Sequence, residues 1–339
     1  MMKSMRESLE YFSREFSPFQ YRQMRILEFP TYATFAQSFA NTVPYSEGIG
    51  FVLDQRDAKS FDVVYYVTSH EVAHQWWGHQ LLPSPNQGWS MLVESFAQYS
   101  ALIALEAAYG EHQMRRFLKY ELDRYLTGRA SEPVAEKPLY RNENQQYIHY
   151  RKGSVVMYEL RDRVGEQVVN RSLARFLEEW AGKTDPYPRT VDYLKILREE
   201  AGPEHNDMIT DMFEKIVLYD LRTKEVEVTP TDDGKYTVSM TVSAAKLEAD
   251  EKGEETEVTL GDGVTFDVGV FSEDLDDVYE GDSHVLHMQK HLLKDGEQTI
   301  EIIVDEAPVM VGVDPYNKMI DRQSDDNVKR VTVDELAAR

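Results

Sequence analysis

Two different patterns of hydrophobic and polar positions follow one another along this chain of 339 residues. Up to about residue 220, apolar positions recur every three or four residues, which is the period of an amphipathic α-helix. Beyond that point, apolar and polar positions alternate, β-branched residues are frequent, and glycine-containing turns intervene, as in half-buried strands. We therefore expect an α+β fold, a mostly helical domain with a small sheet followed by a small antiparallel β-sandwich.

The helical period predicts an amphipathic helix over residues 3–16 and further helices after residue 90. Those further helices are expected over residues 95–109, 113–126, 155–164, 168–180 and 190–200. Short alternating stretches at residues 23–29, 35–40 and 50–53 predict the strands of the small sheet. In the second part, strands are expected at residues 236–242, 256–260, 264–271, 284–292 and 298–304.

Charge separates the same two parts. The formal net charge is −23, and residues 221–339 hold about 12 basic and 29 acidic side chains, so most of the excess lies in the last third. A surface of this sign is unsuited to phosphate backbones, which argues against nucleic acid as a partner. We expect domains at residues 1–220 and 221–323 and a polar tail at residues 324–339.

The amino-acid composition excludes several kinds of chemistry and a membrane span. The chain contains no cysteine, which excludes disulfides, thiolate metal ligands and thiol nucleophiles. It also contains no apolar run of the roughly 20 residues that a membrane span needs, and its first residues lack an apolar signal core. We expect a soluble domain without a membrane span, and the sequence does not assign it to a compartment.

Residues 70–74 read His-Glu-Val-Ala-His, the most informative stretch of the sequence. On a helix, His70 and His74 share one face and can direct their nitrogens at a single ion, for which zinc is the natural candidate. Glu71 lies about 100° around the helix from His70, where it can reach a water molecule beside the ion. The motif therefore predicts a zinc site with Glu71 as general base.

A catalytic zinc usually takes three protein ligands, so one more is needed. The zinc helix is expected to continue through residue 79, a proline-rich turn covers residues 83–88, and a second helix opens at residue 90. On that second helix, Glu94 would face back across the hairpin and complete a His2Glu site. The alternative is that Glu94 is a solvated helix carboxylate.

The stretch HEVAHQWWGH, followed by Glu94, resembles the gluzincin zinc aminopeptidases of the aminopeptidase N and leukotriene A4 hydrolase type. The resemblance covers about residues 20–220 and implies a thermolysin-like catalytic domain that hydrolyses N-terminal peptide bonds. The family also carries a Tyr-Glu-Lys-Gly segment, and residues 150–153, Tyr-Arg-Lys-Gly, match three of its four positions. This match implies that the Tyr150 hydroxyl stabilises the tetrahedral intermediate, with Tyr147 as a nearby competitor.

In the same family, a Gly-x-Met-Glu-Asn motif precedes the first histidine, and its glutamate binds the free α-amine of the substrate. Residues 44–50 occupy that place here and keep only the glutamate, Glu47. The resemblance implies that Glu47 anchors the amine by a charge-assisted hydrogen bond. Because the other motif residues are missing, a zinc endopeptidase remains an alternative.

The amino-acid sequences of these motifs are most similar to those of a bacterial branch of this family, in which the peptidase unit is joined to transporter-permease membrane segments. That likeness implies peptide substrates and a parent polypeptide that tethers this domain to a membrane. An alternative function of another class is that of a zinc-binding sensor or scaffold of a transporter, which binds partners without catalysing a reaction. Glu71 argues against this rival, because a purely structural zinc site needs no base.

Overall fold

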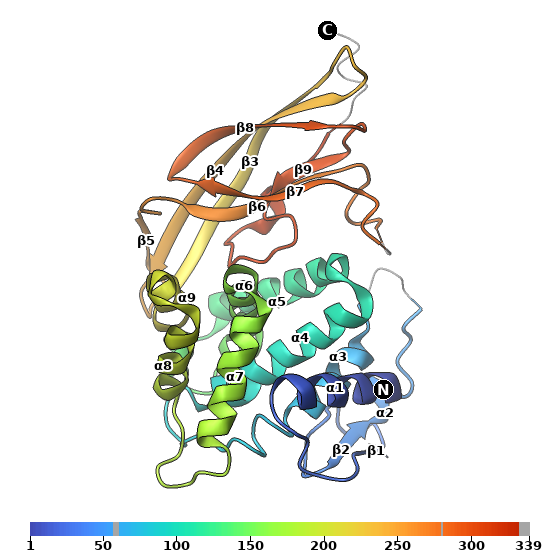
Figure 1. The fold of residues 1–339 in the computed structure, drawn as a ribbon, viewed down its shortest axis with the longest axis vertical. Coiled ribbons are helices and arrows are strands. Elements are labelled where there is room, and N and C mark those ends of the chain that lie inside the picture. Colours follow the sequence, from blue (N-terminus) through green and yellow to red (C-terminus); the bar gives the residue numbers. More distant parts are fainter. Residues whose placement is uncertain (57–60, 279–280, 332–339) are drawn as a thin grey trace.

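The structure, a computed structural model, describes residues 1–56, 61–278 and 281–331 (Figure 1). Helices dominate the chain up to residue 214, and long strands begin at residue 216. The two parts lie end to end, with the strands packed above the ends of the helices (Figure 1). The expected α+β fold is confirmed.

The helices lie close to where the apolar period placed them. Their bounds are α1 Met2–Glu15, α2 Glu47–Gly50, α3 Val63–Ala73, α4 Phe96–Tyr109, α5 Glu111–Ser131, α6 Gly153–Val164, α7 Glu166–Trp180, α8 Thr190–Ala201 and α9 Asn206–Glu214. Short π-helical turns, η1 Met91–Ser95 and η3 Tyr147–Lys152, run directly into α4 and α6, and 3-10 turns cover Leu139–Arg141, Pro203–His205 and Ser324–Asp326. Helix α9 was not expected, because nine residues give too few periods to stand out.

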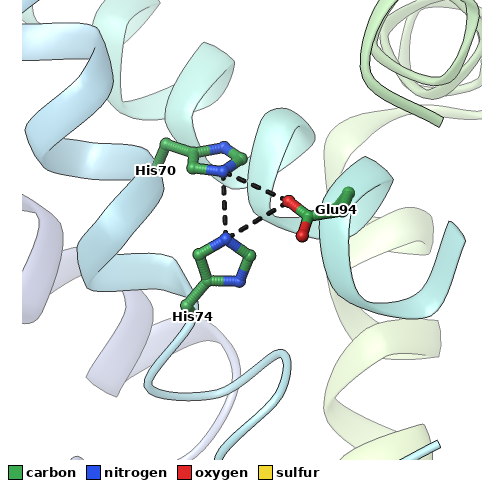
Figure 2. A group of neighbouring side chains, drawn as sticks. All are labelled: His70, His74 and Glu94. Carbon is green, nitrogen blue, oxygen red and sulfur yellow. Dashed lines mark hydrogen bonds and ion pairs between the residues drawn. The ribbon is translucent and has the colours of Figure 1, made fainter. Parts of the chain in front are cut away.

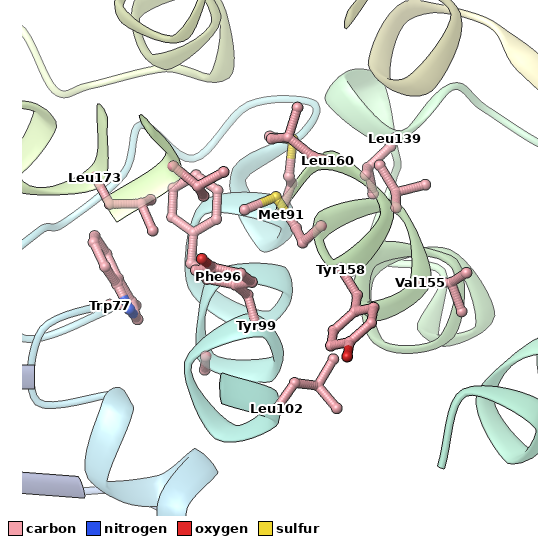
Figure 3. Packing of buried hydrophobic residues seen from close by; sticks show 14 of the residues in the cluster. Trp77, Met91, Phe96, Tyr99, Leu102, Leu139, Val155, Tyr158, Leu160 and Leu173 are labelled. Carbon is pink, nitrogen blue, oxygen red and sulfur yellow. The ribbon is translucent and has the colours of Figure 1, made fainter. Parts of the chain in front are cut away.

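Helix α4 is the centre of the helical part. Every residue from Phe96 to Leu105 is buried, so this part of the helix is covered on all sides and other helices surround it (Figure 3). The ring of Phe96 lies 4.6 Å from that of Tyr193 and 5.2 Å from that of Trp77, centroid to centroid. Truncating such a residue to alanine typically costs about 3–5 kcal/mol. The start of α4 is therefore held rigidly.

The small sheet differs from expectation. Strand β1 Arg25–Phe29 pairs in parallel with β2 Thr42–Ser46, so the predictions of strands at residues 35–40 and 50–53 were wrong. Residues 35–40 instead form isolated antiparallel bridges to the outer side of β2, through Ala36 and Phe39. Proline is rare within strands except at the edge of a sheet, so the presence of Pro44 argued against a strand at the position of β2. Alternation of apolar and polar positions over about five residues was too short a pattern to show that the strand lies at residues 42–46 and not at residues 35–40.

The second part is a sandwich of two antiparallel sheets, as expected. Its strands are β3 Ile216–Pro230, β4 Tyr236–Ala249, β5 Glu255–Val258, β6 Val264–Phe271, β7 Val285–Leu293, β8 Gly296–Val304, β9 Met310–Val313 and β10 Val328–Arg330. One sheet has the order β10-β9-β6-β7, and in the other β4 pairs with β3, β5 and β8. Strands β3, β9 and β10 were not expected.

The expected polar tail from residue 324 is in part a strand, because β10 pairs with β9. Residues 332–339 of that tail lie outside the described residues. Ion pairs of the buried Lys318 join the sandwich to the helices: its Nζ lies within 2.7–2.9 Å of carboxylate oxygens of Glu111, Asp162 and Asp267. None of the described helices has both the length and the apolar character needed to cross a bilayer.

Candidate metal centre

Helix α3 carries the first half of the site. Its N-terminus is capped by Asp62, whose side chain accepts a hydrogen bond of 2.7 Å from the backbone N–H of Tyr65. The helix ends at Ala73, and His74 keeps a helical backbone conformation as its C-cap. His70 and His74 are therefore one turn apart and direct their rings to the same side (Figure 2).

The expectation that this helix continues through residue 79 was wrong. Residues 74–76 and 78–80 form turns, Trp77 makes an isolated bridge to Leu81, and Gly78 has φ +117°, a left-handed conformation that favours glycine. The side chain of Gln75 is buried here, where it hydrogen bonds to Ser38 and to backbone atoms of Phe39 and Asn41. These tertiary contacts compete with helical continuation and hold residues 38–41 beside the histidines.

The turn η1 supplies the third residue. The Glu94 Oε2 lies 3.4 Å from the His70 Nε2 and 3.3 Å from the His74 Nε2, and the two Nε2 atoms are 3.0 Å apart (Figure 2). Among the described residues, this is the group of three whose donor atoms could hold one metal ion. The sequence expectation that Glu94 faces back across the hairpin matches this placement.

The three donor atoms fit a tetrahedral zinc ion. Zn–N and Zn–O bonds of about 2.0–2.2 Å place neighbouring tetrahedral ligands about 3.3 Å apart, close to the separations observed. The Glu94 Oε2 is also buried without a hydrogen-bond partner among the described residues. A buried carboxylate oxygen without a partner is costly unless something else binds it. A bound cation would satisfy this oxygen, and the residues present fit one.

The charged side chains of the site attract one another. Burial alone would raise the pKa of Glu94, but its close contacts with the rings of His70 and His74, and their charge, hold that pKa well below its usual range. Burial alone would lower the pKa of His74, but its contacts with Glu94 raise that pKa to about 9. The carboxylate of Glu94 is thus kept ionised, the state in which it can bind a metal.

Glu71 follows His70 on α3 and lines the same cavity. It is only 6% exposed, and its Oε2 has no hydrogen-bond partner among the described residues. Burial raises the pKa of Glu71, while the nearby His74 and His70 rings oppose that rise. A carboxylate with a raised pKa and a free oxygen is suited to accept and return a proton.

Tyr150 lies on η3 and lines the same cavity as the histidines, with its ring centroid 5.9 Å from that of His70. Burial, and then the charge of Glu94 and a hydrogen bond to it, raise the pKa of Tyr150, so the phenol stays protonated and can donate. The competitor Tyr147 is not among the residues that line the cavity, and its ring stacks on Tyr125 at 6.1 Å.

The structure does not bring Glu47 to this group. Glu47 begins α2, and its Oε1 accepts hydrogen bonds from the Thr31 N–H at 3.0 Å and the Thr31 Oγ1 at 3.2 Å. It is absent from the described lining of the cavity. The distance along the chain to His70 placed it near the site, but the turn at residues 30–33 takes up its carboxylate in this structure.

The cavity has a volume of about 440 Å³. Besides the residues already placed, its lining contains Phe35, Ala36, Gln37, Ser38, Trp77, Gly78, His79 and Val93. Sequence reasoning missed the contribution of residues 35–38, because that segment reaches the site through contacts with Gln75 that no local pattern encodes. His79 also lines the cavity but does not belong to the donor group.

Comparison with known proteins agrees with this geometry. Residues 1–215 match the family model described as the peptidase family M1 domain. The human endoplasmic reticulum aminopeptidase 2 is 26% identical over 168 residues, which cover 47% of this chain and 17% of that protein. Aminopeptidase M1-B of Oryza sativa subsp. japonica is 26% identical over 219 residues, 60% of this chain and 24% of that protein.

Among solved structures, an M1 zinc metallopeptidase from Deinococcus radiodurans has a TM-score of 0.44 and 18% sequence identity. That likeness covers 62% of this chain and 42% of the other. The chain spans about a fifth of the length of the curated relatives that it matches.

Two imidazoles, a carboxylate that can share one ion with them and a second carboxylate beside the first imidazole form the kind of site that zinc-dependent hydrolases use. Since the family model covers more than half of its residues, the chain belongs to peptidase family M1. The donor set and the family together indicate zinc as the cofactor.

Proposed function

We propose that this protein is a zinc-dependent aminopeptidase that hydrolyses the N-terminal bond of peptides. The observation that carries the proposal is the convergence of His70, His74 and Glu94 on one point, with Glu71 lining the same cavity. His70, His74 and Glu94 hold the metal, Glu71 is the general base, and Tyr150 stabilises the oxyanion.

Zinc, when bound, polarises the substrate carbonyl and lowers the pKa of water from about 15.7 toward 7. Glu71 accepts the proton of the attacking water at its free Oε2 and then delivers it to the leaving amine. Tyr150 keeps its proton because of its raised pKa and donates a hydrogen bond to the carbonyl oxygen as charge develops there. Burial of both groups strengthens these interactions, since water does not screen them.

Selectivity for a free N-terminus requires an anion near the first peptide bond. We propose Glu47 for this role, with its side chain leaving Thr31 to meet the substrate ammonium. Its carboxylate is partly exposed, and the two hydrogen bonds that it gives up are with a single residue. A charge-assisted hydrogen bond to the ammonium is stronger than a hydrogen bond between neutral groups, which favours the exchange.

We propose residues 1–220 as the catalytic domain and residues 221–323 as a supporting sandwich. We further propose that the chain is a peptidase unit of the bacterial branch joined to transporter-permease segments, which would tether it to a membrane. The likeness of its motifs to that branch supports this assignment. The size and membrane association of the native polypeptide, detected with an antibody in fractionated source cells, test it.

Two other functions make different predictions. A zinc endopeptidase would cleave peptides whose N-terminus is blocked, whereas an aminopeptidase would not. A non-catalytic sensor would bind peptides at one per zinc without cleaving them. The position of Glu47 against Thr31 favours the endopeptidase over the sensor as the second candidate, because it leaves Glu71 and Tyr150 in place and removes only the amine anchor.

The test is hydrolysis of a panel of aminoacyl chromogenic amides, each with a free and an acetylated amine, by zinc-loaded protein. Glu71→Gln at matched zinc content is the control. The aminopeptidase predicts cleavage of the free amides alone and a loss in the variant of about 10²-fold or more. Equal cleavage of acetylated substrates would show an endopeptidase, and no cleavage by zinc-loaded wild type would refute peptidase activity in this chain.

A further inference from the structure

The third metal ligand and the candidate oxyanion donor both lie on π-helical turns. Glu94 belongs to η1 Met91–Ser95, and Tyr150 belongs to η3 Tyr147–Lys152. A π turn contains an extra residue, interrupts the regular α-helical spacing and often occurs at functional sites. The two turns contact each other, and each runs directly into a buried helix, α4 or α6. Their relative placement therefore sets the distance between the two functional side chains.

One hydrogen bond joins the turns at their point of contact. The Ser95 Oγ donates to the carbonyl oxygen of His149 at 2.7 Å, and Ser95 is fully buried. Ser95 is the residue after Glu94, and His149 is the residue before Tyr150. The bond therefore connects the two segments within one residue of each functional side chain, in a place where water cannot substitute for a lost partner.

Close packing surrounds this bond. A Cβ atom added to Gly153 would lie 2.8 Å from the Ser95 Cβ, closer than carbon atoms approach, so only glycine allows the turns to meet. One turn further along α4, the Gln98 Nε2 donates to the carbonyl oxygen of Tyr150 at 3.4 Å. Phe96, directly after Ser95, is held in the core by the rings of Trp77 and Tyr193. The Ser95 hydroxyl thus links a rigid helix start to the segment that carries Tyr150.

We propose that Ser95 is a positioning residue that fixes the Glu94 carboxylate relative to the Tyr150 hydroxyl by holding the two π turns together. This inference rests on the proposed function, in which Glu94 binds zinc and Tyr150 donates to the oxyanion. A misplacement of about 1 Å at a reacting group can reduce the rate about 10²-fold. Ser95 does not line the cavity, so its effect passes through its neighbours.

The test compares Ser95→Ala with Ser172→Ala. Ser172 is also fully buried and also donates to a backbone carbonyl, that of Val169, at 2.7 Å, but it lies on α7, outside the lining of the cavity. Both variants therefore lose a buried hydrogen bond from a serine to a backbone carbonyl, but the bond of Ser172 lies within its own helix, and Ser172 also contacts the Tyr193 hydroxyl at 3.3 Å. Zinc affinity is measured by competition with a chromogenic chelator, and kcat and KM are measured separately on a free-amine substrate.

We expect Ser95→Ala to weaken zinc binding or lower kcat at least fivefold beyond Ser172→Ala, with KM changed less than twofold. Tyr150→Phe should also lower kcat by a smaller factor in the Ser95→Ala background than in the wild type, because a misplaced hydroxyl contributes less to catalysis. Equal zinc affinity and equal kcat in the two serine variants would overturn the inference. If wild-type protein is inactive, the proposed function fails, and the zinc affinities alone decide the role of Ser95.

Gly153→Ala provides a second variant if Ser95→Ala does not fold. It keeps the hydroxyl but places a methyl group against Ser95. Alanine favours a helix more than glycine does, so lower zinc affinity in Gly153→Ala cannot come from helix propensity. The same fivefold threshold applies, and zinc affinity and kcat equal to those of the wild type would contradict the inference.

Discussion

The Nδ1 atom of His74 lies 3.0 Å from the carbonyl oxygen of Trp77. A carbonyl oxygen only accepts, so Nδ1 keeps a proton, and when the ring loses its second proton it is Nε2 that offers a lone pair to a metal. The contact exists because α3 ends at Ala73 and the chain turns back at residues 75–78. By contrast, the Nδ1 of His70 is buried without a partner among the described residues. The end of the helix thus fixes the orientation of one of the two histidines.

Loss of the third ligand should weaken zinc binding. Glu94→Gln keeps the shape of the side chain but removes the charge that both histidines face. We expect the zinc dissociation constant to rise by more than the roughly 10–100-fold that losing a hydrogen-bond partner of a ligand costs. Competition with a chromogenic chelator measures it, with Glu71→Gln as a control that retains all three donors. Equal affinity in the two variants would exclude Glu94 as a ligand.

Removal of the Tyr150 hydroxyl should slow the chemical step alone. We expect Tyr150→Phe to lower kcat by roughly 10²–10³-fold while KM and zinc content stay close to those of the wild type, because the hydroxyl acts on charge that develops in the transition state. Tyr147→Phe, on the same π turn but outside the cavity lining, is the matched control. An unchanged kcat in Tyr150→Phe would show that another group donates the hydrogen bond to the oxyanion.

Glu47→Gln tests the amine anchor. If Glu47 leaves Thr31 to bind the substrate ammonium, the variant should raise KM for free-amine substrates by about 10–100-fold, the cost of a lost charge-assisted hydrogen bond. Inhibition by acetylated amides, which lack the ammonium group, should not change. Glu28→Gln, an exposed glutamate on the neighbouring strand β1, controls for a general loss of negative charge. Indistinguishable KM values for the two variants would show that the Glu47 carboxylate stays with Thr31.

His149 should make stability depend on pH. It is 2% exposed, and burial lowers its pKa from the ordinary 6.5 to about 4. The unfolded chain therefore binds a proton more readily, so this contribution is complete above pH 6.5 and is lost as the pH falls toward 4. At pH 5 the loss amounts to about 2 kcal/mol.

Urea unfolding in the presence of a chelator, at pH 7.5 and pH 5.0, measures this effect. His149→Gln should be less sensitive to the change in pH than the wild type by about 2 kcal/mol, since glutamine does not titrate in this range. His291→Gln, a histidine of the sandwich that is partly exposed on β7, is the control and should retain most of the wild-type dependence. An equal change in unfolding free energy between pH 7.5 and pH 5.0 for His149→Gln and the wild type would contradict the prediction.

Much of the fold could be predicted because local patterns determine local structure. The apolar period placed α1, α4, α6, α7 and α8 to within about two residues, and α5 somewhat less closely. Alternation placed β6 at its observed bounds and β7 one residue early. Helix and strand periods involve neighbours a few residues apart, and burial of one face reinforces them.

The core of the candidate site was also contained in the sequence. The spacing of His70 and His74 brings their rings together on any helix, and the proline-rich turn before residue 90 returns the chain so that Glu94 meets them. Glu71 follows from the same helix. These relationships need only helix geometry and a short connection between two helices.

Only the tertiary structure decided the rest. The end of α3 depends on the Gln75 side chain reaching residues 38–41, and β2 depends on pairing with β1 rather than on its own alternation. The contact of Glu47 with Thr31 and the bond from Ser95 to His149 likewise join residues that are distant in sequence. Such contacts form between segments that come together only in the packed chain, so no local period specifies them.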